Sequence, residues 1–157
     1  MTGTPFPRST IGLYRRVLEN RLQLHLNNDT AQLEAGQQAL RRFLEAEGTS
    51  ARALYHAELA FEELVTNVIR YAYGDRDRGM CPIDVSAWVR GEEIVFTIED
   101  TGPRFDPSQA VDAPLATRIE DTRIGGLGLR LVRMAARRVH YERVGDKNRV
   151  TLDIPRT

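Results

Sequence analysis

The sequence contains a single cysteine, Cys81, among 157 residues, so it cannot form an internal disulfide bond. Its cysteine and histidine residues also lack the spacing of a metal site. No stretch approaches the ~18 consecutive apolar residues of a membrane-spanning helix, and residues 1–7 lack the basic start and apolar run of a secretory signal. We therefore expect a protein of the reducing cytoplasm that is neither secreted nor inserted in a membrane.

Charge of either sign is not in excess, because 22 lysine and arginine residues balance 22 aspartate and glutamate residues. This balance gives no reason to expect nucleic acid or an anionic membrane as the main partner. The length suits one domain that buries roughly two-thirds of its unfolded surface without metals or disulfides. We expect residues 21–157 to form this domain, after an N-terminal segment at residues 1–20.

The N-terminal segment divides into a proline-containing leader at residues 1–8 and a short helix from Ser9 onward. The helix is predicted because apolar residues recur at helical spacing, namely Ile11, Tyr14, Val17 and Leu18. Residues 21–27 then alternate strictly between leucine and polar side chains, which predicts a strand with one buried and one wet face. His25 lies on the wet face and is not expected to bind a metal.

Two helices follow this strand. The first can be capped by Asp29 or Thr30, and Gly48 supplies its stop. Ser50 can begin the second, which runs to Gly74 and buries one stripe of apolar residues: Leu54, Ala57, Phe61, Leu64, Val65, Val68 and Ala72.

The middle of the chain alternates over residues 83–98 in two runs about Gly91, which predicts a β-hairpin. Trp88 is expected to be partly covered on this sheet. The second strand leads into Asp100-Thr101-Gly102-Pro103, where glycine and proline prevent it from continuing. An acidic side chain is therefore expected at the exit of the strand.

A long connection at residues 108–123 follows, of the kind that forms a lid or is disordered. Gly125-Gly126-Leu127-Gly128 then opens a helix, and residues 139–154 alternate as a final hairpin. The order strand, helix, helix, strands, connection, helix, strands predicts a two-layer α/β sandwich. Its helices would lie on one face of a mixed, mostly antiparallel sheet.

Three of these stretches carry groups that suit a nucleotide. Glu63 and Asn67 lie four residues apart, so a helix places a carboxylate and an amide side by side, and Mg²⁺ takes such oxygen ligands. A glycine-rich helix start offers free backbone N–H groups to phosphate. Residues 125–128 lack the lysine of a Walker loop and do not follow a strand, which excludes both that loop and the dinucleotide fingerprint.

The specific feature is the order of the three stretches: Glu-x-x-x-Asn on a helix, Asp-x-Gly at a strand exit, then Gly-x-Gly at a helix start. This set resembles the nucleotide boxes of the GHKL ATPase superfamily, which has the Bergerat fold. Residues 62–73, Glu-Glu-Leu-Val-Thr-Asn-Val-Ile-Arg-Tyr-Ala-Tyr, and residues 100–107, Asp-Thr-Gly-Pro-Arg-Phe-Asp-Pro, are similar to its anti-sigma-factor serine/threonine kinases. The resemblance spans roughly residues 21–155.

The resemblance implies a role for several residues. Asn67 would bind Mg²⁺ and Glu63 would be the general base. Asp100 would accept a hydrogen bond from the adenine amino group, which favours adenine over guanine because an unpaired buried polar group costs about 1 to 3 kcal/mol. Gly102 would let the backbone pass close to the base, and Phe105 is expected beside the pocket as a plug over the core.

The phosphates would be wrapped by the second glycine box, which comprises Gly125, Gly126, Leu127 and Gly128. Family members often place an arginine just ahead of this box. Arg123 lies near that place, but Ile124 and Gly125 intervene, so its contact with the terminal phosphate stays open. The chain also departs from the family after the asparagine box, where Arg70 and Tyr71 occupy a region that commonly holds histidine.

The function implied by the resemblance is transfer of phosphate from ATP, with Mg²⁺, to a serine of a small anti-anti-sigma (STAS) protein. The protein would also bind a sigma factor or a comparable regulator. An ATP-binding module that switches partners without transferring phosphate is the alternative. A detached histidine-kinase domain is disfavoured, because His56 lacks the proline that usually follows a phosphoacceptor histidine. The family often dimerises through its sheet, which leaves a homodimer open.

Overall fold

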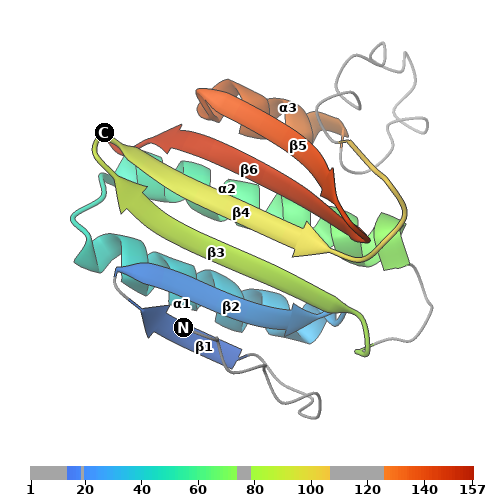
Figure 1. Cartoon of the computed structure of the whole chain (residues 1–157). Coiled ribbons are helices and arrows are strands. Elements are labelled where there is room, and N and C mark those ends of the chain that lie inside the picture. The colour runs from blue at the N-terminus through green and yellow to red at the C-terminus, as the bar shows by residue number, and fades with distance from the viewer. Residues whose placement is uncertain (1–13, 19, 74–78, 107–125) are drawn as a thin grey trace.

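The computed structural model of the protein describes residues 14–18, 20–73, 79–106 and 126–157. Six strands form one sheet: β1 Tyr14–Leu18, β2 Arg21–Asn27, β3 Pro82–Arg90, β4 Glu93–Asp100, β5 Arg138–Val144 and β6 Lys147–Pro155. Their order across the sheet is β1-β2-β3-β4-β6-β5 (Figure 1). Each neighbouring pair is antiparallel, so the described strands do not include the parallel pair of a mixed sheet.

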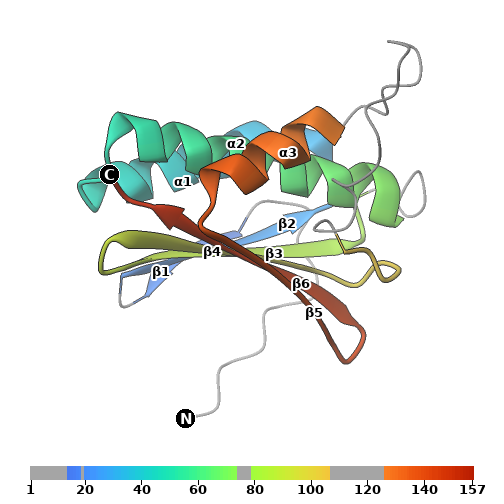
Figure 2. The ribbon, with the colours of Figure 1, turned by 90° about the horizontal axis from the view of Figure 1, so that it is seen from above.

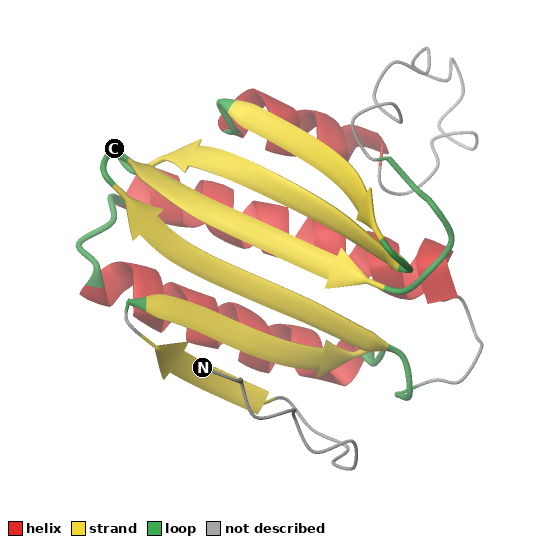
Figure 3. Cartoon of the chain, viewed as in Figure 1, coloured by secondary structure: helices red, strands yellow, loops and turns green. Residues whose placement is uncertain are grey.

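Within the described residues, three α-helices cover one face of this sheet: α1 Leu33–Ala46, α2 Ala51–Asn67 and α3 Gly126–Ala135. From above, all three lie on the same side of the strands (Figure 2), and Figure 3 shows them in red behind the sheet. The predicted two-layer α/β sandwich is therefore confirmed. None of the helices in the described ranges has both the length and the apolar character needed to cross a membrane.

Alternation along the strands builds the core between the two layers. In β2 every second residue is buried, namely Leu22, Leu24 and Leu26. β4 follows the same period with Ile94, Phe96 and Ile98, and this period also places Asp100 on the helix-facing side. Between the layers, the ring of Phe61 in α2 contacts Phe96 edge to face, with 6.4 Å between ring centroids.

The prediction of a helix from Ser9 was wrong. Residues 14–18 form strand β1, which pairs with residues 21–25 of β2. The chain turns at Asn20, whose φ of 61° is a left-handed conformation that asparagine tolerates. The pairing supplies partners for the backbone groups of β2, which would otherwise form the edge of the sheet, whereas a helix this short is marginal by itself. Residues 1–13, with the predicted leader, lie outside the described residues.

The other predicted helices and strands are present in the described residues. Asp29, however, caps a short 3₁₀ turn, Thr30–Gln32, which precedes α1, and does not cap α1 itself. Ser50 caps α2 by accepting a hydrogen bond from the backbone N–H of Ala53 (3.2 Å). Gly48, with a φ of 71°, follows the end of α1. The end of α2 differs, because α-helical geometry stops at Asn67 and a π-helical segment, Val68–Tyr73, continues the chain. The predicted stop at Gly74 lies outside the described residues.

One ion pair ties α1 to α2. Glu58 of α2 is 8% exposed, and Arg41 of α1 donates to it twice, from Nε to Oε1 (2.7 Å) and from Nη2 to Oε2 (2.6 Å). This bidentate contact satisfies both oxygens of the carboxylate. Removal of the arginine would leave a buried charge without its donor, which is more destabilising than the absence of both partners.

We expect Arg41→Met to lower the free energy of unfolding by about 2 kcal/mol, because the Glu58 carboxylate would lose a charged hydrogen-bond donor. Arg42→Met is the matched control, since Arg42 is the exposed neighbour on the same helix, and should change that free energy by less than about 0.5 kcal/mol. The double variant Arg41→Met/Glu58→Met should recover most of the loss. Urea unfolding followed by circular dichroism measures all three; equal effects at positions 41 and 42 would contradict the expected role of the pair.

Candidate functional site

The end of α2 brings a carboxylate and an amide to one side of the helix. Glu63 is half-buried and Asn67, one turn later, is only 7% exposed. Directly after Asn67 the helix widens into the π-helical segment Val68–Tyr73. Such wide turns are rare and occur frequently at functional sites. The wide turn therefore begins directly after Asn67, one helical turn beyond Glu63.

Asp100 ends β4 on the helix-facing side and is 7% exposed. Its Oδ1 accepts two hydrogen bonds, from the backbone N–H of Gly102 (2.8 Å) and from Nδ2 of Asn148 (2.9 Å). Burial raises the pKa of the Asp100 carboxyl, while the two hydrogen bonds and the nearby Arg143 guanidinium act in the opposite direction. The carboxylate is thus held through one oxygen, and no described residue donates a hydrogen bond to Oδ2.

The loop after β4 passes very close to the π-helical segment. A Cβ on Gly102 would lie 2.5 Å from the Cβ of Ala72 and 3.2 Å from its Cα, so only glycine fits there. The Tyr73 hydroxyl accepts a hydrogen bond from the backbone N–H of Thr101 (2.8 Å) and donates to the carbonyl of Pro82 (2.8 Å). These contacts fix the π-helical segment against the exit of β4.

Asn67 and Asp100 line one small cavity of about 30 Å³ between α2 and the ends of β4 and β6. Phe105, which is 42% exposed, and Asn148 also line it. The remaining wall is apolar and consists of Leu64, Val68, Ala72, Ile98 and Val150. An apolar wall with a few convergent polar groups is the usual make-up of a small-molecule site.

The first turn of α3 lies against Glu63. Gly128 is buried, and a Cβ at this position would overlap the Glu63 carboxylate, so the helix can approach this closely only with glycine. The amino end of a helix carries unpaired N–H groups and a partial positive charge, which favour an anion. The end of α2, the exit of β4 and the start of α3 therefore converge, although they are far apart in the sequence.

A divalent cation would find oxygen ligands here without a complete protein cage. The Asn67 amide would offer its oxygen to such an ion, and its buried Nδ2 has no hydrogen-bond partner among the described residues. Within the described ranges, no three His, Cys, Asp or Glu side chains gather to hold a metal. Glu63 and Asn67 fit a hydrated ion such as Mg²⁺, which usually takes its remaining ligands from water and phosphate.

The other residues predicted from the sequence are placed only in part. Gly126 and Leu127 lie in the first turn of α3, where the backbone alone is described. Arg123 and Gly125 lie outside the described residues.

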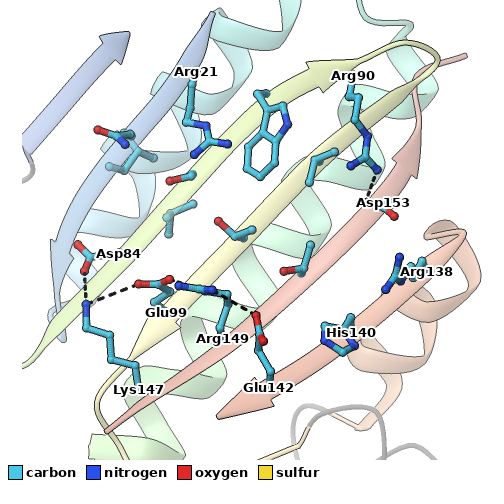
Figure 4. A pocket seen from close by; sticks show the side chains of 18 of the residues that line it. Arg21, Asp84, Arg90, Glu99, Arg138, His140, Glu142, Lys147, Arg149 and Asp153 are labelled. Atoms are coloured by element: carbon cyan, nitrogen blue, oxygen red, sulfur yellow. Dashed lines mark hydrogen bonds and ion pairs between the residues drawn. The ribbon is translucent and has the colours of Figure 1, made fainter. Parts of the chain in front are cut away.

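A second hollow, of about 630 Å³, lies on the face of the sheet that the helices leave open (Figure 4). The strand register aligns a polar row along its floor: Gln23, Ser86, Thr97, Thr151 and His140. On one side of this row, the Arg21 guanidinium lies 3.8 Å from the centroid of the partly covered Trp88 ring. The partial cover of Trp88 agrees with its predicted position on the sheet.

The other side of this hollow is a row of charged residues, ordered across the strands as His25, Asp84, Glu99, Arg149 and Glu142. Arg149 donates from Nε to Glu99 Oε1 (2.6 Å). Lys147 lies between the two acids that the register places opposite each other, 3.7 Å from Asp84 Oδ2 and 3.6 Å from Glu99 Oε2. The opposite charges of this row pair with one another, and the predicted nucleotide residues that the structure describes lie on the other face.

Comparison with known proteins agrees with this geometry. Residues 26–154 match the family model of the histidine kinase-like ATPase domain. The chain belongs to this family. The resemblance to GHKL anti-sigma kinases that the sequence motifs indicated is thereby confirmed.

Several relatives of this ATPase-domain family are similar to the chain. The serine/threonine-protein kinase BtrW of Bordetella bronchiseptica is 31% identical over 103 residues, which cover 66% of this chain and 71% of BtrW. The solved RsbU and RsbW domains of Rv1364c from Mycobacterium tuberculosis share the fold with a TM-score of 0.59 at 16% identity, over 85% of this chain and 32% of theirs. This chain thus spans about a third of that solved chain.

A further solved structure with this fold is the histidine kinase domain of the blue-light activated histidine kinase from Erythrobacter litoralis EL346. It has a TM-score of 0.50 and 19% identity, over 76% of this chain and 60% of the other. At this level of identity the two solved structures show the fold alone.

Sequence reasoning on this ATPase domain missed Tyr73, Arg143 and Asn148. Both Arg143 and Asn148 lie within the predicted final hairpin at residues 139–154, whose alternation gives neither of them a specific role. The strand register would have found both, because Asn148 is the partner of Asp100 across β4 and β6, and Arg143 is the partner of Asn148 across β5 and β6. That register is a tertiary property, so the local pattern did not reveal it.

The electrostatic surroundings of Glu63 suit proton transfer. Burial raises the pKa of its carboxyl, the neighbouring Glu62 carboxylate raises it further, and the Arg70 guanidinium lowers it. A general base acts best when its pKa is close to the working pH. The surroundings of Glu63 thus raise the pKa of its carboxyl, which is the direction that a general base requires.

We expect Glu62→Gln to lower the pKa of the Glu63 carboxyl, because a like charge is removed, and Arg70→Met to raise it, because a cation is removed. Arg52→Met is the control, since Arg52 lies three turns earlier on α2 and is exposed. Carbon-13 NMR titration of the Glu63 carboxyl measures the shifts. An unchanged Glu63 pKa in both test variants would exclude this control by neighbouring charges.

Proposed function

We propose that the protein is an ATP-dependent serine/threonine-protein kinase that phosphorylates a STAS-type anti-anti-sigma protein and also binds a sigma factor or a comparable regulator. The observation that carries the proposal is that Asn67 lines one cavity with Asp100, while Glu63, one turn earlier on α2, lies against Gly128. The similarity to BtrW, which is named a serine/threonine-protein kinase, supports it. A chemically suited group of the protein is available for the adenine ring, for the phosphates and for the transfer of the terminal phosphate.

The adenine ring would enter the cavity between α2 and β4. Its amino group would donate to Asp100 Oδ2, the carboxylate oxygen to which no described residue donates. Guanine carries a carbonyl at the same position and would leave the buried carboxylate unpaired, which costs about 1 to 3 kcal/mol. Because the cavity measures only about 30 Å³, the exposed ring of Phe105 would move aside to admit a purine.

The phosphates would lie at the amino end of α3, where backbone N–H groups and the helix dipole favour anions. Gly126 and Gly128 add no side chains of their own at this helix start. Asn67 would hold Mg²⁺ through its amide oxygen, and the ion, when bound, would neutralise charge on the phosphates. Arg123 stays a proposed contact of the terminal phosphate.

Glu63 would act as the general base. The serine oxygen of the partner attacks the terminal phosphorus, the bond from that phosphorus to the ADP oxygen breaks, and the serine proton passes to the Glu63 carboxylate. The raised pKa of Glu63 makes this carboxylate a better proton acceptor.

One observation favours the alternative, an ATP-binding module that switches partners without transferring phosphate. Gly128 lies so close to Glu63 that a Cβ would overlap the carboxylate. The start of α3 would therefore have to move before a serine hydroxyl could reach Glu63. In the alternative, Glu63 would stay covered and the nucleotide would only change the affinity for protein partners.

We expect Glu63→Gln to reduce phosphate transfer about 10²- to 10⁴-fold, the usual contribution of a general base, while the Kd for ATP changes less than about threefold. Asp100→Asn should weaken ATP binding itself by about tenfold, because an amide replaces the charged acceptor. Glu34→Gln, at an exposed position on α1 away from the candidate site, is the matched control. Phosphoserine on a STAS protein is measured by mass spectrometry, and ATP affinity by calorimetry.

The result also separates the two functions. Nucleotide-dependent partner binding without any phosphoserine in the wild-type protein would support the partner switch and overturn the kinase. Normal transfer by the Glu63 variant would remove the assigned base and leave the nucleotide site in place.

A further inference from the structure

The strand register builds a row of polar side chains behind Asp100. Asp100 of β4 pairs with Asn148 of β6, and Asn148 pairs with Arg143 of β5. Directly opposed residues of antiparallel strands point to the same face, and Asn148 is 3% exposed on the helix-facing side. The three side chains therefore lie side by side where the sheet meets the cavity.

The amide of Asn148 is fully used by the protein. Its Nδ2 donates to Asp100 Oδ1 (2.9 Å) and to the carbonyl oxygens of Pro103 (2.8 Å) and Gly102 (3.3 Å). Its Oδ1 accepts from the Tyr141 hydroxyl (2.8 Å) and from Arg143 Nη1 (3.0 Å). A side-chain amide has two donors and two acceptor sites, so these five contacts exhaust it. Asn148 lines the cavity but has no hydrogen-bonding capacity left for a ligand.

Arg143 supports the same arrangement from the edge strand. Its Nη1 also donates to the carbonyl oxygen of Gly102 (2.7 Å), so one guanidinium holds both Asn148 and the loop after β4. The positive charge of Arg143 also favours the ionised form of Asp100. Among the described residues, the charged or titratable groups that contact this cluster are Arg143 and Tyr141 from β5 and Tyr73 from the π-helical segment.

We propose that Asn148, held by Arg143 and Tyr141, is a positioning residue that sets the adenine preference of the site by fixing the Asp100 carboxylate with Oδ2 toward the cavity. This inference rests on the proposed function, because it requires adenine at Asp100. Two hydrogen bonds hold Oδ1 in place, one from Asn148 and one from Gly102. Without the first, the carboxylate can turn about its last bond, whose rotation is otherwise soft, and its acceptor oxygen is no longer aligned with the amino group.

The test compares ATP with purine riboside triphosphate, which lacks the 6-amino group and is otherwise the same ligand. The ratio of the two Kd values reports the hydrogen bond between the amino group and Asp100. We expect the wild-type protein to prefer ATP about tenfold, as one charge-assisted hydrogen bond allows. Asn148→Ala should reduce this preference to about twofold or less, through weaker ATP binding with little change for the analogue.

Three further variants test whether a cavity or a general loss of structure, and not the position of the Asp100 carboxylate, explains a change in the ATP preference. Asn148→Asp keeps the shape of the side chain but replaces the donor with an acceptor, so the ATP preference should be lost without a cavity. Arg143→Met should lower the preference for ATP, because the Asn148 amide would lose a donor that holds it in place. Arg149→Met is the matched control, since Arg149 lies next to Asn148 on β6 but points to the open face and pairs with Glu99; it should keep the wild-type ratio.

A ligand-free measurement separates the inference from the proposed function. Carbon-13 NMR titration of Asp100 should show a higher carboxyl pKa in Asn148→Ala and Arg143→Met than in the wild type, and no change in Arg149→Met. If the wild type binds no ATP while these shifts occur, the proposed function fails and the positioning of Asp100 stands. If ATP binds and the preference survives in both Asn148 variants, the positioning role is overturned and the function stands.

Discussion

The buried carboxylate of Asp100 is the constraint on which the rest of the site depends. A charge placed on the core side of a sheet is tolerated only when hydrogen bonds and nearby opposite charge replace its water. Here Asn148, the Gly102 backbone and Arg143 provide that environment through Oδ1 and its surroundings. Both hydrogen bonds that the described residues donate to the Asp100 carboxylate therefore reach Oδ1, and none of these residues donates to Oδ2.

The second constraint is close approach of the backbone. Gly102 lies against Ala72, and Gly128 against Glu63, at distances that no Cβ allows. These two positions bring the loop after β4 and the start of α3 onto the end of α2. The alternation of side chains along β4 is a third constraint. Every second residue of β4 faces the helices, so Asp100 lies on the side of the sheet where α2 ends. Glycine placement and strand period together assemble one site from three distant segments.

Much of this was predictable from local sequence pattern. The leucine alternation of β2, the Ser50 cap of α2 and the glycine-rich start of α3 each have a short-range physical cause, and the structure places them as expected. The strand at residues 14–18 was missed because the local pattern shows only the helical spacing of its apolar residues. Its pairing with β2 is a tertiary interaction that outweighs this local preference. The role of Asn148 was missed for the same reason, since only the register shows that it lies opposite Asp100.

The most direct test of the central claim is the set of backbone amide NMR shifts that change when Mg²⁺ and ADP are added to the protein. A single nucleotide site between the three segments predicts the largest changes near Asn67, Gly102 and Gly128, on three separate elements at once. Changes gathered instead along Gln23, Thr97 and Thr151, on the open face of the sheet, would contradict it.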